Sequence, residues 1–532
     1  MADAGNTGNE LATTGKAMGG NGAPAGRTCG FGLSTILRHS ALLILIVLSL
    51  AYVAGGRYLL QRQMWMDEVH SWLLIKEPDP ERSLRALADG VDFNPPTYLV
   101  LARQLQYLPG GVTELGLRWF SLSLMLLAIV GVFVVLHRRF PLLICIAATL
   151  MMVSNVHLVH QSAEIRFYPL WCAACAWLCV VLDVRTHQPV YWQRINNMAA
   201  VLLAGIITTT HYFGILSLGL ICLGAMLVPE LSRSRRWLIV LTALTGILCL
   251  AGCIPFLIGQ RAALTRATWI SPATVSDSIG FLTAILPVIP LIVCGAAVLV
   301  TLALEKSEKQ EQRASSLFVD ELRSLAPCLM LTLMPLVIVL VSWTVQPALV
   351  TRYAVTGVLG FGTVFAVLMS RSGIRLQLVL VVAAGGFLLR QVATCGNQWQ
   401  EVDQRRDALV NQLQNLPSEG PIIFEDRTIS MPVLHSHPEL LSRCALVDFS
   451  DDQLSQDSRL RAVQRDVGRR ILKWYPDYAM RSLNSLSDEQ TFYVVPYTES
   501  QTASLEWPVG FRVTHVSATV DRYDRIDNNP AK

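Results

Sequence analysis

Two adjacent acidic residues, Asp67 and Glu68, follow a long apolar run, residues 41–60, and are flanked by Trp65 and Trp72. Tryptophan favours the membrane interface, because its ring is apolar while its N–H needs a polar partner. Carboxylates are disfavoured there, since anionic headgroups and a low dielectric both oppose added negative charge. The pair is therefore either a solvated loop feature or part of a site that performs acid–base chemistry beside the membrane.

The composition is that of a membrane protein. Of 532 residues, 52% are hydrophobic and 15% are charged, and the net charge is +4. Soluble globular proteins carry about 25% charged residues, so this depletion indicates the membrane. The small net charge, without a basic tract interleaved with aromatic residues, gives no sign of a nucleic-acid partner.

Apolar runs that meet the usual length of a membrane-spanning helix, about 17–25 residues, occur about eleven times. They cover residues 41–60, 115–136, 142–159, 170–184, 198–210, 212–228, 238–258, 281–304, 328–343, 355–369 and 376–389. Residues 1–40 lack apolar periodicity, and we expect them to be disordered and cytoplasmic. No cleavable signal is expected, because the first apolar run comes late and is long. The sequence predicts a polytopic α-helical membrane domain over residues 41–394.

Basic residues mark alternate loops: Arg138 and Arg139; Arg185 and Arg194; Arg233, Arg235 and Arg236; Lys306, Lys309 and Arg313; Arg371 and Arg375. The positive-inside rule makes these loops and the N-terminus cytoplasmic. An odd number of spans then places residues 395–532 outside. The chain also lacks an Asn-x-Ser/Thr acceptor, and together these features favour a bacterial inner membrane with a periplasmic tail.

The polar clusters all fall on the outer side of this topology. The first outer loop, residues 61–114, holds the acidic pair and a helix expected after Pro96, too short to span and placed along the interface. The middles of the apolar runs are almost free of charge. A transporter or ion pump needs polar groups or broken helices near the midplane. We therefore expect the working site at the outer interface.

The tail, residues 395–532, has a different character. Residues 402–416 have helical spacing, and residues 421–424, 445–449, 492–495 and 511–513 have the pattern of short buried strands. This predicts a small α/β domain outside the membrane. The tail has no glycine-rich phosphate loop, so we assign it no nucleotide.

The outer clusters, in this order, resemble the GT-C class of membrane glycosyltransferases. More closely, they are similar to the family of protein O-mannosyltransferases and bacterial lipid A aminoarabinose transferases. Met66-Asp67-Glu68 resembles the family's acidic motif in the first outer loop. Residues 94–98 match a His-Pro-Pro-x-Tyr pattern with Asn94 in place of histidine, and residues 164–168 resemble a Glu-x-Arg-x-Tyr segment. His211-Tyr212, residues 269–272 and Arg352-Tyr353 also fall where the family has such residues. The match covers residues 41–389.

The resemblance implies transfer of a sugar from a polyprenyl-phosphate donor to a glycan, lipid or protein acceptor on the non-cytoplasmic face. Such transfer needs a base for the acceptor hydroxyl, and Asp67 is the expected base, with desolvation raising its pKa. Glu68 is expected to orient or bind the acceptor. Arginine can clamp the departing phosphate or extend to lipid headgroups instead. The expected substrate-binding residues are Arg352, Arg166, Tyr353, Glu164, Tyr168, His211, Asn94, Tyr98, Trp269 and Lys76.

Other readings of the sequence stay open. His157, His160 and Glu164 share a helical face and are a metal-site alternative to plain interfacial residues. The sequence requires no cofactor and leaves a divalent metal undecided. Of the 12 cysteines, Cys395 and Cys444 lie in the tail region, where one disulfide bridge is conceivable. A lipid or glycan flippase or transporter and a non-catalytic membrane receptor remain the alternative functions.

Overall fold

The computed structural model describes residues 57–183, 190–228, 231–263, 270, 272–288, 291–292, 295–296, 299, 322–370, 374–448, 459–486, 489–496, 511–517 and 519–526. The expected disordered segment, residues 1–40, lies outside the described residues, as does most of the first expected span. Of that span the structure describes the short helix α2 (Arg57–Gln61).

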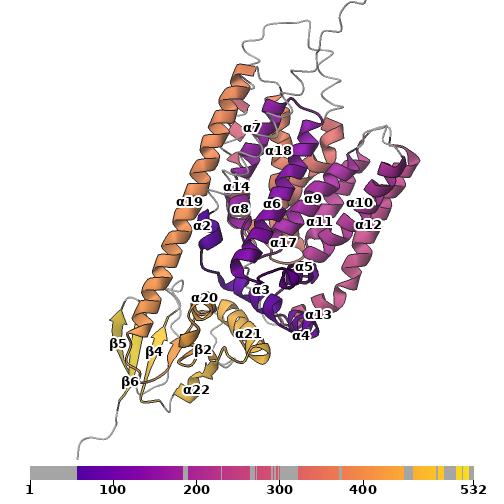
Figure 1. The fold of residues 1–532 in the computed structure, drawn as a ribbon. Coiled ribbons are helices and arrows are strands. Elements are labelled where there is room, and N and C mark those ends of the chain that lie inside the picture. The colour runs from indigo at the N-terminus through magenta and orange to yellow at the C-terminus, as the bar shows by residue number, and fades with distance from the viewer. Residues whose placement is uncertain are drawn as a thin grey trace, which may run out of the picture. The chain divides into compact units, whose positions relative to one another are not determined.

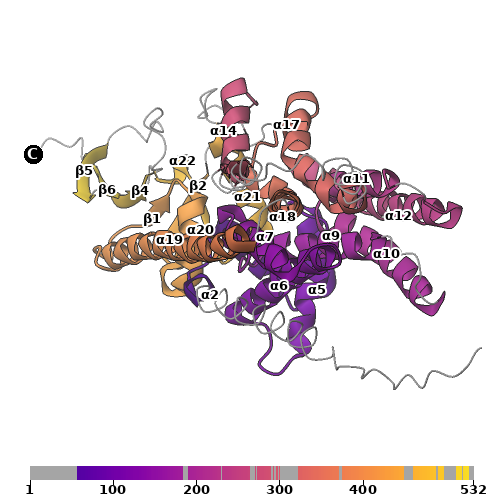
Figure 2. The same cartoon turned by 90° about the horizontal axis from the view of Figure 1, so that it is seen from above.

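The described chain confirms a polytopic helical membrane protein. Five helical segments are long and apolar enough to cross a membrane: Glu114–His137, Arg233–Gly252, Leu322–Thr344, Thr351–Met369 and Ile374–Gln414. Shorter apolar helices are α7 (Leu142–Val153), α9 (Tyr168–Leu182), α11 (Gly214–Met226) and α14 (Val275–Ile285). Helix α10 (Val190–Thr210) packs beside α12 (Arg233–Gly252), as Figures 1 and 2 show.

Two expected spans are each divided into two helices in the structure. The span at 142–159 is divided into α7 and α8 (Val156–Gln161), because the Asn155 side chain caps the second helix by accepting a bond from the His157 N–H. The span at 238–258 is divided at Cys253 into α12 and α13 (Ile254–Ala263). The hydropathy of the sequence does not show where a side chain such as that of Asn155 caps a helix. By contrast, α18 (Val355–Met369), which follows the short 3₁₀ helix η3 (Thr351–Ala354), has the expected bounds.

The first outer loop folds into three α-helices, α3 (Met66–Lys76), α4 (Pro80–Ala88) and α5 (Thr97–Arg103), and the short 3₁₀ helix η1 (Gln104–Tyr107). Asp79 caps α4, which the sequence did not predict. Pro96 immediately precedes α5, the helix that the sequence predicted after this proline. The C-terminal end of α3 is held by the buried Arg103, whose guanidinium donates to the carbonyl oxygens of Leu74, Ile75 and Glu77. The loop is therefore a packed unit with a fixed α3.

The eleventh expected span and the expected helix at 402–416 are one 41-residue helix, α19 (Ile374–Gln414), so the domain boundary expected at residue 395 falls inside a continuous helix. The α/β domain follows it (Figure 1). Its strands are β1 (Ile422–Phe424), β2 (Cys444–Asp448), β3 (Met480–Ser482), β4 (Thr491–Val495), β5 (Phe511–Ser517) and β6 (Val520–Arg525). The four expected strands are confirmed, and β3 and β6 were not expected.

The sheet has the order β3-β2-β1-β4-β6-β5. The first four strands in this order are parallel, and β6 and β5 add an antiparallel hairpin. Helix α20 (Arg427–Ser436) connects β1 to β2, and α21 (Arg459–Trp474) connects β2 to β3. The chain then returns to the other side of β1 to form β4. Phe492, Val494 and Tyr523 pack in the core of the domain.

Candidate active site

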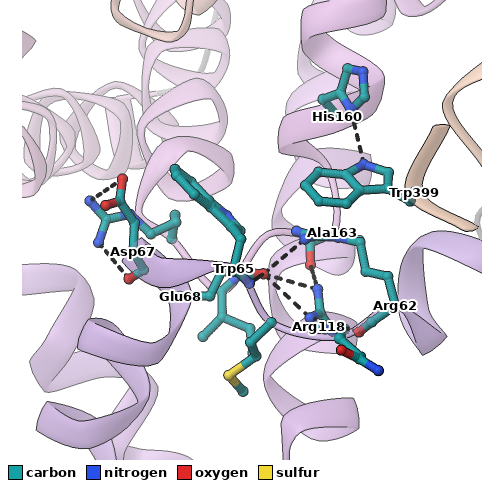
Figure 3. A network of polar contacts seen from close by, with 12 residues as sticks. Arg62, Trp65, Asp67, Glu68, Arg118, His160, Ala163 and Trp399 are labelled. Atoms are coloured by element: carbon teal, nitrogen blue, oxygen red, sulfur yellow. Dashed lines mark hydrogen bonds and ion pairs between the residues drawn. The ribbon is translucent and has the colours of Figure 1, made fainter. Parts of the chain in front are cut away.

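The first turn of α3 presents Asp67 and Glu68 in different directions. Adjacent residues on a helix do not face each other, and Figure 3 shows the two acids turned apart, with Arg62 and Arg118 on the Glu68 side. Acidic residues are favourable in a first turn, because the helix N-terminus carries partial positive charge. Glu68 also accepts a bond from the backbone N–H of Trp65, which fixes the start of the helix.

Glu68 is completely buried, with a side-chain exposure of 0%. Arg62 and Arg118 each pair with it at 2.9 Å, and the Ile165 N–H donates to it at 2.8 Å. Burial acts to raise the pKa of Glu68, but Arg118 and Arg62 outweigh it and hold the pKa below its usual value. The expectation that Glu68 binds the acceptor does not fit this environment. Its carboxylate instead joins the first outer loop to α6 (Glu114–His137) and to the segment before α9.

Asp67 has a side chain that is 14% exposed and lies between two guanidinium groups. Its Oδ2 is 3.1 Å from Arg352 and 3.9 Å from Arg166. Arg352, itself 19% exposed, also lies over the ring of Trp65 at 5.0 Å. Burial acts to raise the pKa of Asp67, but the two arginines outweigh it and lower the pKa. The expected raised pKa is therefore wrong in direction, since the sequence did not show that both arginines lie against the Asp67 carboxylate.

A second carboxylate, Asp92, fixes Arg166. It pairs with that guanidinium at 2.7 Å and accepts hydrogen bonds from the Ser71 hydroxyl and the Asn94 amide. Arg166 also donates to the Ser71 hydroxyl and to the backbone oxygen of Asp67. Asn94, which stands where the resembled family has histidine, thus acts on the site through Asp92. Sequence reasoning missed Asp92; its only signal was its position two residues before Asn94.

The expected residues His211, Tyr168 and Tyr353 form one aromatic cluster. His211 stacks on Phe167 with ring centroids 4.7 Å apart, and the Tyr353 ring lies 5.3 Å from it. The rings of Tyr168 and His211 are 6.3 Å apart. His211 Nδ1 accepts a bond from the Phe213 N–H, which assigns that nitrogen as unprotonated. The Arg166 guanidinium lies over the Phe167 ring of this cluster at 5.3 Å, and Arg352 directly precedes Tyr353.

Glu164 lies near the Asp67 and Glu68 groups and is 3% exposed. Burial and the like charge of Glu68 raise its pKa to about 7, against the opposing effect of Arg62. Its Oε2 has no hydrogen-bond partner among the described residues. A carboxyl group with this pKa changes its protonation state in the physiological range.

The other expected residues have more distant or separate positions. Tyr98 and Asn94 line a cavity of about 20 Å³, room for one water molecule, together with Asp92. Lys76 is exposed at the far end of α3, over the ring of Trp72. Trp269 lies outside the described residues.

The metal-site alternative is not supported by the side chains involved. The His157 ring contacts the backbone oxygen of Ala284, while the His160 ring accepts a bond from Trp399. No group of three or more potential metal ligands occurs among the residues that the structure describes. Cys395 and Cys444 are both free thiols, so the conceivable bridge between them is not formed.

The partners of Glu68 were also missed by sequence reasoning. Arg118 had a usable signal, because it is a charged residue near the start of an apolar run. Arg62 had none, since a basic residue just after a span is ordinary. Two further groups near Asp67, His70 and Arg427, were likewise missed.

No family model matches the chain, and no curated protein matches it. Two solved structures, however, are similar to the chain in fold. ArnT from Cupriavidus metallidurans bound to undecaprenyl phosphate is similar with a TM-score of 0.58 and 12% sequence identity, over 92% of this chain and 99% of that one. The same protein in the apo state gives a TM-score of 0.58 and 12% identity, over 91% and 98%. The chain therefore has the fold of ArnT, the GT-C fold that the outer-face motifs predicted.

Proposed function

We propose that the protein is a membrane glycosyltransferase that moves a sugar from a polyprenyl-phosphate-linked donor to an acceptor hydroxyl. The observation that carries the proposal is the partly exposed ion pair between Asp67 of α3 and Arg352 of η3, beside Arg166. The fold supports it, because ArnT with the same fold binds undecaprenyl phosphate. Carboxylate and guanidinium together supply the base and the phosphate clamp that this transfer needs.

The transfer follows as an inverting single displacement. The acceptor oxygen attacks C1 of the donor sugar as the bond from C1 to the phosphate oxygen breaks. The acceptor proton passes to Asp67, and the polyprenyl phosphate leaves with the electron pair of the broken bond. A double displacement needs a second carboxylate that reaches the sugar. Glu68 has a side-chain exposure of 0%, Asp92 is held by Arg166, and Glu164 is only 3% exposed. We therefore assign the reaction to Asp67 alone, whose side chain is 14% exposed.

Donor binding activates the base. In the free protein Arg352 and Arg166 hold the pKa of Asp67 low, which makes it a weak proton acceptor. A donor phosphate draws the Arg352 fork towards its own oxygens, and its negative charge raises the pKa of Asp67. The carboxylate thus becomes a stronger base when donor is present. The same arginine then stabilises the charge that develops on the leaving phosphate.

We assign the site to the periplasmic face of a bacterial inner membrane, with about eleven spans and the C-terminal domain on the same side. This assignment is supported by the basic residues, which are concentrated in alternate loops between the apolar runs. The acceptor is a hydroxyl of a glycan, lipid or protein, and the surrounding membrane lipid holds the donor's polyprenyl chain. The proposal assigns no step to a metal or cofactor.

The test is transfer by the purified protein in vesicles. A synthetic polyprenyl phosphate carrying a radiolabelled sugar is added with an envelope-lipid extract as acceptor. We expect label to move to the acceptor while free polyprenyl phosphate accumulates in equal amount. Movement of the intact labelled lipid between leaflets, without cleavage, would establish the flippase alternative instead. Neither cleavage nor movement with any polyprenyl-phosphate sugar would end the proposal.

A further inference from the structure

The C-terminal domain contacts the helix that carries Asp67. Helix α20 packs against α3, and at one end of this contact the His435 ring meets the Trp72 ring edge to face at 5.7 Å. The same histidine pairs with Glu114 at 2.8 Å, at the start of α6. Before α3, Arg406 of α19 donates to the backbone oxygen of Met64 at 2.9 Å. Residues more than 300 positions later in the chain therefore surround the first outer loop.

The other end of α20 presents Arg427 to the first turn of α3. Arg427 is 5% exposed, and its Nε donates to the Met66 sulfur at 3.4 Å. Thioether sulfur is a weak acceptor and does not neutralise a guanidinium. Burial lowers the pKa of Arg427 to about 10, while Asp67 and Asp426 oppose that change. Asp67 is thus one of two acids whose charge sustains this buried cation.

The topology of the sheet explains why a functional residue stands at this position. Strand order reverses between β1 and β4, since the chain proceeds from β1 to β2 and β3 on one side and returns to place β4 on the other. Open parallel sheets bind their ligands outside the carboxyl ends of the strands at such a switch point. Arg427 begins the helix directly after β1. The edge of the domain that is suited to binding therefore meets α3.

We propose that Arg427 is a positioning residue of the Asp67 site, so that the C-terminal domain completes the site from the extramembrane side. The basic groups around Asp67 are Arg352 from η3, Arg166 from the segment before α9, His70 from α3 itself and Arg427 from α20. Two tyrosines, Tyr353 of η3 and Tyr168 of α9, also lie near its carboxylate. His70 is buried beside two of these cations, which together with its burial lowers its pKa to about 3, so it adds no charge. Arg427 is thus a third cation, supplied by a different domain. The inference rests on the proposed function, in which Asp67 is the base.

The test measures the protonation of Asp67 without requiring turnover. A carbodiimide modifies protonated carboxyl groups, and the extent of modification at Asp67, located by mass spectrometry, is followed against pH. In Arg427→Met one cation is lost, so the midpoint should move to higher pH by on the order of half a unit. Arg427→Lys should restore most of the shift. Arg469→Met is the matched control, because Arg469 of α21 is half exposed and pairs with Asp448 of β2.

Thermal unfolding of each variant shows whether it is folded. If Arg427→Met does not fold, Arg427→Gln takes its place, because glutamine keeps an N–H donor for Met66 and loses the charge. The inference then predicts the same shift of the Asp67 modification midpoint to higher pH in Arg427→Gln. An unchanged midpoint in a folded variant that lacks the cation, or an equal shift in Arg469→Met, would overturn the inference. The wild-type protein could transfer no sugar while the midpoint of Asp67 modification still depends on Arg427. That result would contradict the proposed function but would support the effect of Arg427 on Asp67.

Discussion

Arg352 and Asp67 form an ion pair of 3.1 Å between η3, which leads into α18, and the first turn of α3. The two residues are far apart in sequence. Both side chains are partly exposed, at 19% and 14%, whereas the side chains in the neighbouring Glu68 pairs are at most 1% exposed. A partly exposed charge pair can exchange one partner for a substrate. The buried pairs cannot, and they hold the framework.

Arg352→Lys and Arg352→Ala test the phosphate clamp. A charge-assisted bond of this kind is worth roughly 1.5–3 kcal/mol, or about ten- to a hundred-fold. Lysine keeps the charge but loses the planar fork, so it should cost part of this, and alanine should cost more. Because charge develops on the leaving phosphate, kcat should fall as well as the apparent affinity. Steady-state kinetics with varied donor measures both.

Arg375→Ala is the control for that experiment, since Arg375 is an exposed arginine near the start of α19. If Arg352 only extends to lipid headgroups, its variants should resemble Arg375→Ala. They would then transfer sugar at the wild-type rate.

Glu68→Gln should act on stability. The substitution leaves Arg62 and Arg118 buried without their countercharge, and breaking a buried pair in this way costs about 3–5 kcal/mol. Thermal unfolding in detergent should show a large decrease in the midpoint. Glu81→Gln is the control, because Glu81 is exposed and pairs with the exposed Arg85, and it should change the midpoint little. A Glu68→Gln protein as stable as wild type but inactive would restore the catalytic role expected from the sequence.

Much of the helical domain could be predicted from local pattern. The bounds of α18 follow from an apolar run with charged residues beyond its end. In the C-terminal domain, strands β1, β2 and β4 likewise follow from short apolar runs between turn residues. Strand β6 was missed because its sequence, Val-Asp-Arg-Tyr-Asp-Arg, is mostly charged and is ordered by pairing with β4 and β5. The division at Asn155 depends on a cap that hydropathy does not register.

The site was predicted in part, and its missing members share a physical reason. Asp67 was recognisable because acids are unusual beside a membrane, and Arg352 and Arg166 because guanidinium groups suit phosphate. Asp92 and Arg427 act through contacts between residues 74 and 361 positions apart, which no local pattern encodes. The prediction that the pKa of Asp67 is raised was wrong for the same reason. The sequence indicated the burial of its carboxylate but not the number of cations that surround it.

Stability should depend on pH through Glu164. Burial raises its pKa from 4.5 to about 7, so between these values the folded protein keeps a proton that the unfolded chain has released. Unfolding then releases a proton, and stability falls as pH rises through this window. Glu164→Gln cannot ionise. The difference in unfolding midpoint, variant minus wild type, should therefore increase from pH 5 to pH 8, and a constant difference would show that Glu164 titrates normally.

The orientation of the tail is testable by fusion. The basic loops place residue 532 outside the cytoplasm, so alkaline phosphatase fused after Lys532 should be active in a bacterial host. A cytoplasmic reporter at the same point should be silent. The reverse pattern would invert the topology and move the Asp67 site to the inner face.

Single-turnover transfer by Asp67→Asn tests the central claim most directly. The asparagine side chain keeps the size of Asp67 but cannot take the acceptor proton, so the variant should insert, fold and retain labelled donor without transferring its sugar. We expect a loss of at least about a hundred-fold, as for removal of a general base. Transfer by Asp67→Asn at the wild-type rate, with donor bound equally well, would contradict the account.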